Sequence, residues 1–79
     1  SIGYIPSASQ YTLMAYNYND EEHLYSVDSD VREVKLIENR AIKHTYCDNS
    51  LWTVYMVTDG MVCMYNGEKV INIGMPELD

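Results

Sequence analysis

Three runs of apolar, β-branched and aromatic residues fill the C-terminal part of the chain, and two glycine-containing dipeptides separate them. The dipeptides, Asp59-Gly60 and Asn66-Gly67, supply the positive φ angles that tight β-hairpin turns require. The pattern therefore predicts an antiparallel meander of three strands, at residues 51–58, 61–66 and 68–73.

The register of this meander decides which side chains share a face of the sheet. If both turns are two-residue loops, Tyr55 lies opposite Met64, and Met64 lies opposite Lys69. One face would then carry Trp52, Val54, Met56, Met61, Cys63, Tyr65 and Val70, and the other Thr53, Tyr55, Val57, Val62, Met64, Ile71 and Ile73. Neither face is polar, so the pattern predicts a sheet that is covered on both sides.

Residues 30–44 fit an amphipathic helix that could supply one covering layer. Asp30 is a suitable N-cap with Glu33 three residues later, and the apolar positions that follow have helical spacing: Val31, Val34, Ile37 and Ala41. Alternatively, Val34 and Leu36 together with Ile42, His44 and Tyr46 mark two short strands about a turn at Asn39-Arg40. The helix is the favoured interpretation.

The N-terminal part predicts a β-hairpin, with a strand at 10–18, a polar turn at 19–22 and a return strand at 23–27. This hairpin either extends the sheet or lies over the face that the helix leaves bare. The expected fold is thus a single α+β domain over residues 1–79, with a hairpin, one helix at about 30–44 and a C-terminal meander. The alternative is an all-β, barrel-like meander of six or seven short strands.

The composition is that of an ordinary globular protein, with 47% hydrophobic and 22% charged residues. No apolar run approaches the ~20 residues of a membrane span, and no signal-peptide pattern precedes the first strand. Cys47 and Cys63 are expected to be reduced rather than paired, and the protein is expected in the cytoplasm.

The charges are unevenly distributed. The formal net charge is −7, and the first basic residue is Arg32, so residues 1–31 hold acidic side chains without a single Lys or Arg. Such a region repels nucleic acid and anionic membranes and favours a protein partner with a basic surface.

Tyrosine is the second unusual feature, because the chain has eight Tyr, one Trp and no Phe. Tyr provides a large contact area at low entropic cost and is enriched at interfaces. The predicted partner-binding residues combine both features: Tyr11, Tyr16, Tyr18, Asp20, Glu21, Glu22, Tyr25, Asp28 and Asp30. We therefore expect a non-enzymatic acidic binding module, an inhibitor that occupies a nucleic-acid- or nucleotide-binding surface of its target.

The residue usage is typical of AT-rich genomes such as those of bacteriophages, apart from the missing Phe.

Catalytic and metal-binding patterns are weak. His44 and Cys47 are three residues apart, which brings side chains together on a helix but not on a strand. The chain has no close Cys-Cys or His-His pair of the kind that structural zinc sites use, and Asp28-Ser29-Asp30 lacks the glycine of a calcium loop. No enzyme activity, metal or cofactor is expected.

Two other functions remain as alternatives. The chain could be a structural protein that forms a homodimer or larger homo-oligomer through an apolar sheet face. It could also stack single-stranded nucleic acid on its tyrosines, which would require Arg32, Lys35, Arg40 and Lys43 to line one face. Direct nucleic-acid binding is disfavoured because the chain has five basic residues in all.

Overall fold

The computed structural model describes residues 2–76 and builds them almost entirely from β-strands. The elements are β1 (Ile2–Ile5), a 3-10 turn η1 (Pro6–Ala8), β2 (Gln10–Tyr16), β3 (Glu22–Asp28), β4 (Val34–Glu38), β5 (Ile42–Asp48), β6 (Thr53–Val57), β7 (Val62–Tyr65) and β8 (Val70–Gly74). No helix of these residues is long and apolar enough to cross a membrane.

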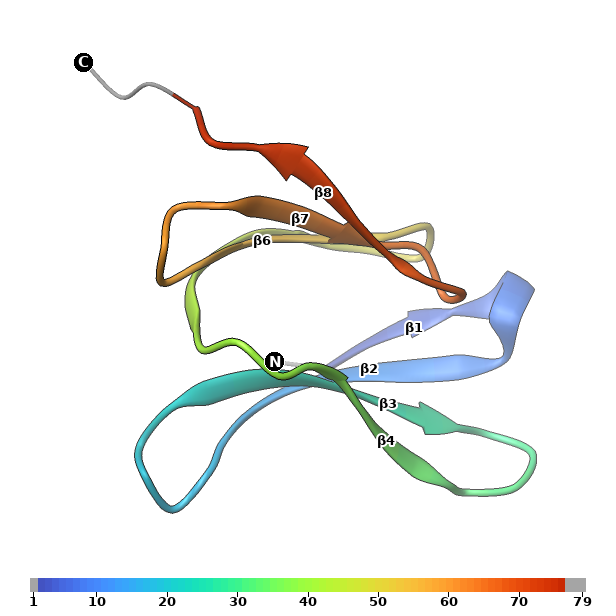
Figure 1. Cartoon of the computed structure of the whole chain (residues 1–79). Coiled ribbons are helices and arrows are strands. Elements are labelled where there is room, and N and C mark those ends of the chain that lie inside the picture. Colours follow the sequence, from blue (N-terminus) through green and yellow to red (C-terminus); the bar gives the residue numbers. More distant parts are fainter. Residues whose placement is uncertain (1, 77–79) are drawn as a thin grey trace.

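The strands form two antiparallel four-stranded sheets that stack face to face (Figure 1). Sheet 1 has the order β1-β2-β3-β4, and sheet 2 has the order β5-β6-β7-β8. Each sheet is a simple meander, and the chain passes between them once, through residues 39–41. The N-terminal hairpin therefore does not extend the C-terminal meander but covers one face of it.

The predicted helix at 30–44 is wrong, and with it the α+β fold class. These residues form β4, a short turn at Asn39-Arg40 and the first part of β5, as the two-strand alternative had it. The all-β alternative fits, although the chain forms eight strands in two sheets rather than six or seven in a barrel-like meander.

Local hydrogen bonds explain why no helix begins at Asp30. The carboxylate of Asp28, not that of Asp30, accepts the backbone N–H groups of Asp30 and Val31, at 2.9 and 3.2 Å. The turn closes where Arg32 adopts a positive φ of 56° and donates its N–H to the Asp28 carbonyl oxygen, 2.7 Å away. The chain then reverses and pairs with β3, which satisfies its backbone groups without a helix.

The meander of sheet 2 was predicted correctly, but its register was not. In the structure Tyr55 pairs with Cys63 and Met64 pairs with Ile71. The first turn is longer than expected: Val57 donates its N–H to the Met61 carbonyl oxygen, with Gly60 at a φ of 94°. The loop therefore has three residues instead of two, and the pairing of β6 with β7 moves by one residue. As a result, the side chains of β7 and β8 lie on the opposite face of the sheet from the one expected.

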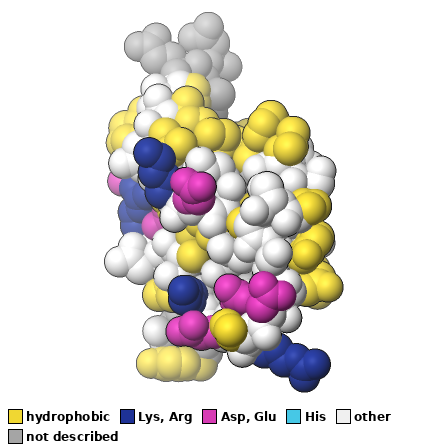
Figure 2. Space-filling model, turned by 90° about the vertical axis from the view of Figure 1, so that its right-hand side faces the viewer, with side chains coloured by type: hydrophobic (Ala, Val, Ile, Leu, Met, Phe, Trp, Pro, Cys, Tyr) yellow, Lys and Arg dark blue, Asp and Glu magenta, His cyan; other side chains and the backbone are white. Residues whose placement is uncertain are grey.

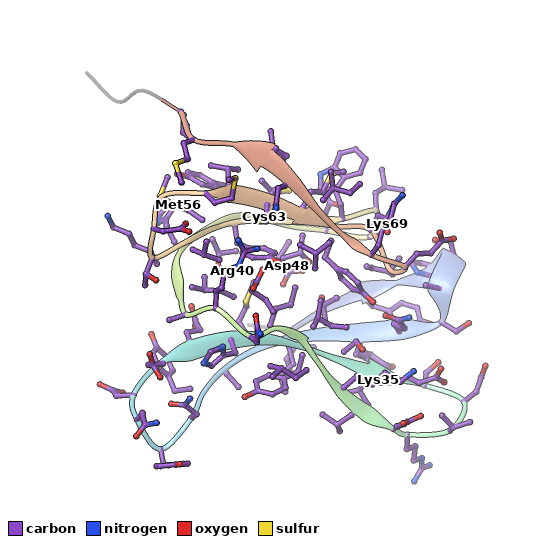
Figure 3. The ribbon with its side chains drawn as sticks, viewed as in Figure 1. Lys35, Arg40, Asp48, Met56, Cys63 and Lys69 are labelled. Carbon is purple, nitrogen blue, oxygen red and sulfur yellow. The ribbon has the colours of Figure 1, made fainter. Side chains whose placement is uncertain are left out.

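The core lies between the sheets. Its fully buried side chains include Ile5 and Leu24 from sheet 1 and Tyr55, Val57 and Cys63 from sheet 2. Polar contacts also join the sheets: Tyr65 donates its hydroxyl to Oε1 of Gln10 at 2.6 Å, and Thr12 donates its hydroxyl to Oδ1 of Asp48 at 3.1 Å. Figure 3 shows Arg40, Asp48 and Cys63 in the space between the sheets.

Candidate functional site

The turn between β2 and β3 gathers five of the nine predicted partner-binding residues. We call residues 16–22 the acidic tip: Tyr16, Tyr18, Asp20, Glu21 and Glu22. Tyr18 is 97% exposed and Tyr16 is 68% exposed. The tip projects from one end of sheet 1 (left in Figure 1), so its aromatic rings and carboxylates are open to a partner.

The acidic tip is held by its own hydrogen bonds. Oδ1 of Asn17 accepts the backbone N–H groups of Asn19 and Glu21, at 2.9 and 3.1 Å. The N–H of Asn17 in turn bonds to the Glu21 carbonyl oxygen at 3.0 Å, and Asp20 takes a positive φ of 63°. A short polar residue such as Asp tolerates this left-handed conformation. The two exposed tyrosines therefore stand on an ordered turn.

The other four predicted residues lie elsewhere. Tyr11 and Tyr25 are in the middle of sheet 1, on the face directed away from sheet 2. Asp28, the last residue of β3, and Asp30, in the turn that follows, are at the opposite end of the sheet, ~20 Å from the tip by the rise of a seven-residue strand. The carboxylate of Asp28 also serves as the local turn acceptor described above. The predicted site is thus not one continuous acidic surface.

The basic residues do not line one face either. Arg32 and Lys35 are exposed in and after the β3–β4 turn, Lys43 is exposed on β5, and the guanidinium of Arg40 turns inward toward Glu38. Figure 2 looks onto the end of the molecule with the β3–β4 turn, where basic and acidic side chains alternate. This arrangement gives no support to a nucleic-acid surface formed by these four cations.

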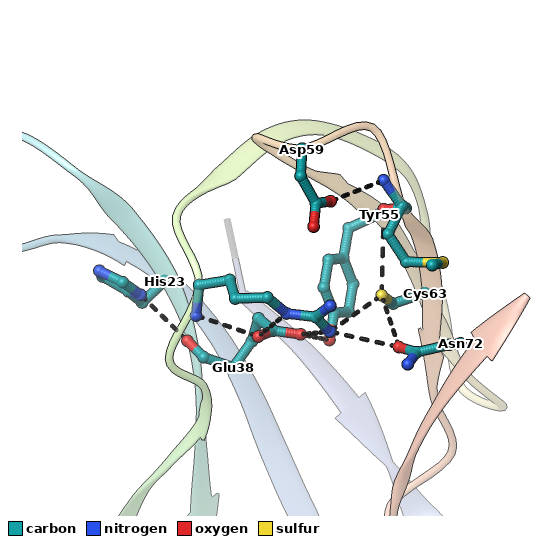
Figure 4. A network of polar contacts seen from close by, with 8 residues as sticks. His23, Glu38, Tyr55, Asp59, Cys63 and Asn72 are labelled. Atoms are coloured by element: carbon teal, nitrogen blue, oxygen red, sulfur yellow. Dashed lines mark hydrogen bonds and ion pairs between the residues drawn. The ribbon is translucent and has the colours of Figure 1, made fainter. Parts of the chain in front are cut away.

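A second candidate site, which the sequence did not indicate, is a polar cluster between the sheets (Figure 4). Its centre is Glu38, the last residue of β4, whose side chain is only 3% exposed. Oε2 accepts Nε of Arg40 at 2.9 Å, and Oε1 accepts a guanidinium nitrogen of Arg40 and the hydroxyl of Tyr55, at 2.9 and 2.8 Å. The same guanidinium nitrogen lies 3.3 Å from both Sγ of Cys63 and Oδ1 of Asn72. We call these residues the Glu38 cluster.

Burial and the neighbouring charges shift the ionisation of this cluster. Burial alone would raise the pKa of Glu38, but hydrogen bonds from Arg40 and Tyr55 prevail and hold that pKa below its ordinary value. Burial and the hydrogen bond to Glu38 raise the pKa of the Tyr55 hydroxyl. Burial also raises the pKa of the Cys63 thiol, although Arg40 opposes the shift. At neutral pH the cluster therefore combines an ionised Glu38 and Arg40 with a neutral phenol and thiol.

The Glu38 cluster joins the two sheets through hydrogen bonds and one ion pair. A reactive cysteine needs an accessible thiolate, whereas Cys63 is fully buried with a raised pKa. Every buried side-chain oxygen and nitrogen of the described residues has a hydrogen-bond partner. The cluster instead links the end of sheet 1 to sheet 2 beside the one connection between them.

The weak chemical patterns of the sequence do not assemble. The ring of His44 packs edge-on against Tyr46 with centroids 4.7 Å apart, while Sγ of Cys47 accepts a hydrogen bond from Asn49 at 3.1 Å. Cys47 and Cys63 are both free thiols. Within residues 2–76, no three His, Cys, Asp or Glu side chains gather in a group that could hold a metal ion.

The outer face of sheet 2 bears a shallow apolar groove of about 580 Å³. Its lining comes from all four strands and the segment after β8: Tyr46, Val54, Val62, Ile73, Gly74, Met75 and Pro76. The sequence predicted that this sheet would be covered on both sides. In the structure sheet 1 covers its inner face, and no element of the described residues covers its outer face.

Comparison with known proteins gives no independent guide to the function. The chain matches no family model, no curated protein and no solved structure.

Proposed function

We propose that this chain is a non-enzymatic protein-binding module that uses the acidic tip to bind a basic surface of another protein. The observation that carries the proposal is the exposure of Tyr18, at 97%, and Tyr16, at 68%, on an ordered turn with three neighbouring carboxylates. The other predicted aromatic and acidic residues, on the sheet face and in the opposite turn, are not needed for this contact.

The tyrosines would supply most of the affinity. Exposed aromatic side chains are the usual hot spots of interfaces, because each buries a large area and loses little rotamer entropy. The hydrogen bonds of Asn17 fix the turn before binding, so less conformational entropy is lost on association.

The carboxylates would supply association rate and selectivity. Asp20, Glu21 and Glu22 lie in a region with no basic residue before Arg32, so their field is not cancelled locally. Carboxylates beside aromatic rings resemble the phosphates and bases of a nucleotide chain. The proposed target is therefore a nucleic-acid- or nucleotide-binding protein, which the module would inhibit by occupying its basic cleft. Two free thiols fit a reducing compartment such as the cytoplasm.

The test compares two variants of equal charge. Asp20→Asn, Glu21→Gln and Glu22→Gln together remove the tip carboxylates. The control, Asp30→Asn, Glu33→Gln and Glu68→Gln, removes three exposed carboxylates elsewhere. A partner captured from the producing cell with the unaltered chain is purified, and its association rate is measured against salt concentration.

We expect the tip variant to associate at least tenfold more slowly at low salt, with a flatter salt dependence, while the control stays within twofold of the unaltered chain. Heparin or DNA should displace the unaltered chain from its partner. Equal association rates for the tip variant and the unaltered chain, or a complex indifferent to heparin and salt, would overturn the proposal.

A further inference from the structure

The outer face of sheet 1 carries no formally charged side chain on any of its four strands. The pairing of β1, β2, β3 and β4 places Tyr4, Tyr11, Leu13, Tyr25, Val34 and Leu36 on this face. Val34 is 62% exposed, Leu36 is 54% exposed, and the rings of Tyr4 and Tyr11 lie with centroids 4.7 Å apart. We call this surface the tyrosine face.

An exposed antiparallel sheet normally alternates apolar inward and polar outward residues. Here the outward positions are as apolar as the inward ones, although the chain as a whole has a net charge of −7. Contiguous apolar surfaces of this kind are rare on monomers and mark interaction sites. The charges of sheet 1 lie mainly at its two ends, so they frame the tyrosine face without interrupting it.

The two ends of the tyrosine face differ in charge. The acidic tip, with Asp20, Glu21 and Glu22, lies at one end and has no basic residue. The other end mixes Arg32 and Lys35 with Asp28, Asp30 and Glu33, so two positive and three negative charges give it a formal charge of −1, against −3 at the tip. Figure 1 shows the β2–β3 and β3–β4 turns at opposite ends of sheet 1. In Figure 2 basic and acidic side chains lie beside one another at the β3–β4 end.

We propose that the tyrosine face binds the tyrosine face of a second copy, with the two-fold axis in the plane of the face and perpendicular to the strands. This axis brings each acidic tip to the less acidic β3–β4 end of the other copy, where Arg32 and Lys35 offset most of the charge of Asp28, Asp30 and Glu33. The alternative axis, parallel to the strands, would bring two tips together and set three carboxylates against three others. Repulsion at this rim disfavours it.

The available area is sufficient for such a dimer. Four strands spaced ~4.8 Å apart and about five residues long project roughly 330 Å². Protruding side chains raise the accessible surface to about 500–600 Å² per copy, or about 1,000–1,200 Å² in total, which is the lower end of specific interfaces. We therefore expect a dimer that dissociates in the micromolar range.

A second copy fits the tyrosine face better than a basic partner does. The face offers no carboxylate to select a cation, and contact between identical uncharged surfaces leaves no charge buried without a partner. The proposed function uses the tip, whereas the dimer uses the face and has the tip only at its rim. Sedimentation of the chain alone, without any partner, therefore tests the dimer separately from the proposed function.

The test is sedimentation equilibrium of the full chain from 1 to 500 μM, with two variants of matched chemistry and exposure. Leu36→Asp introduces a charge on the tyrosine face, and Ile73→Asp introduces one on the outer face of sheet 2, where Ile73 is 58% exposed. We expect the unaltered chain and Ile73→Asp to dimerise, and Leu36→Asp to weaken dimerisation at least tenfold. Val34→Lys provides a second variant on the tyrosine face if Leu36→Asp proves poorly folded by circular dichroism.

The orientation is tested by charge reversal. Arg32→Glu with Lys35→Glu should weaken the dimer at low salt, and adding Asp20→Lys with Glu21→Lys to the same chain should restore it. A strict monomer at 500 μM, a species larger than a dimer, or dissociation by Ile73→Asp and not by Leu36→Asp would each overturn the proposed dimer. An unchanged dimer after the first charge reversal, or no recovery after the second, would overturn its orientation.

Discussion

The Glu38 cluster yields a quantitative prediction about stability. Replacing Arg40 with Met leaves the Glu38 carboxylate, 3% exposed, with its Tyr55 and backbone hydrogen bonds but without its counter-ion. Removing one partner of a fully buried ion pair costs about 3–5 kcal/mol. Arg40 is 36% exposed. Water therefore screens part of the interaction, and we expect a loss of about 2–3 kcal/mol.

This loss is large for a chain of this size. Per-residue scaling gives a net stability of roughly 4–12 kcal/mol for 79 residues. Urea unfolding can be followed by the fluorescence of Trp52, the only tryptophan of the chain. We expect Arg40→Met to lower the urea midpoint clearly while leaving the dependence on urea concentration unchanged, because the area exposed on unfolding is similar.

A double-mutant cycle separates charge from packing. Glu38→Gln removes the buried charge and retains an acceptor for Tyr55, so Arg40→Met should cost at least 1 kcal/mol less in that background than in the unaltered chain. The folded-state pKa of Glu38 is lowered, so its contribution is present above the unfolded pKa, ~4.3, and is lost as the pH falls through the folded value. Additive losses, or equal acid sensitivity of the Glu38→Gln variant and the unaltered chain, would refute the role of the buried ion pair.

The turn dipeptides predicted where the C-terminal strands reverse, but not how they pair. Asp59-Gly60 is compatible with a two-residue loop and with a three-residue loop that ends in a left-handed glycine. The structure takes the second form, with Gly60 at a φ of 94°. A difference of one loop residue moved Cys63 and Tyr65 onto the face of Tyr55, inside the core. Turn composition therefore predicts a hairpin more securely than its register.

The error at residues 30–44 has a different origin. Apolar residues at Val34, Ile37 and Ala41 fit a helix, while Val34, Leu36 and Ile42 fit two strands, so local periodicity does not decide. The pairing of β4 with β3 decides between helix and strands, because β4 satisfies the backbone hydrogen bonds along that edge of β3.

The acidic tip was largely predictable, since its residues are contiguous in sequence. The Glu38 cluster was not, since Glu38, Tyr55 and Cys63 meet only when the two sheets stack.

Three further predictions follow from the fold. Far-ultraviolet circular dichroism should show a β-sheet spectrum without a helical component, and a clear helical contribution would contradict the strands at 34–48. Gly3→Ala should lower stability by about 1–3 kcal/mol in urea unfolding, because a Cβ there would overlap Oδ1 of Asp48; an unchanged midpoint would show that this contact relaxes freely. Stability should also fall at alkaline pH, because burial raises the folded-state pKa values of Cys63 and Tyr55. Their contribution is complete below the unfolded pKa values, about 8.5 for Cys and 10 for Tyr, and is lost as the pH rises toward the folded values, because only the unfolded chain then releases these protons. The urea midpoint should therefore be lower at pH 10 than at pH 7, and less so in Cys63→Ala; the same midpoint at both pH values would mean that these groups ionise as readily in the folded core as in water.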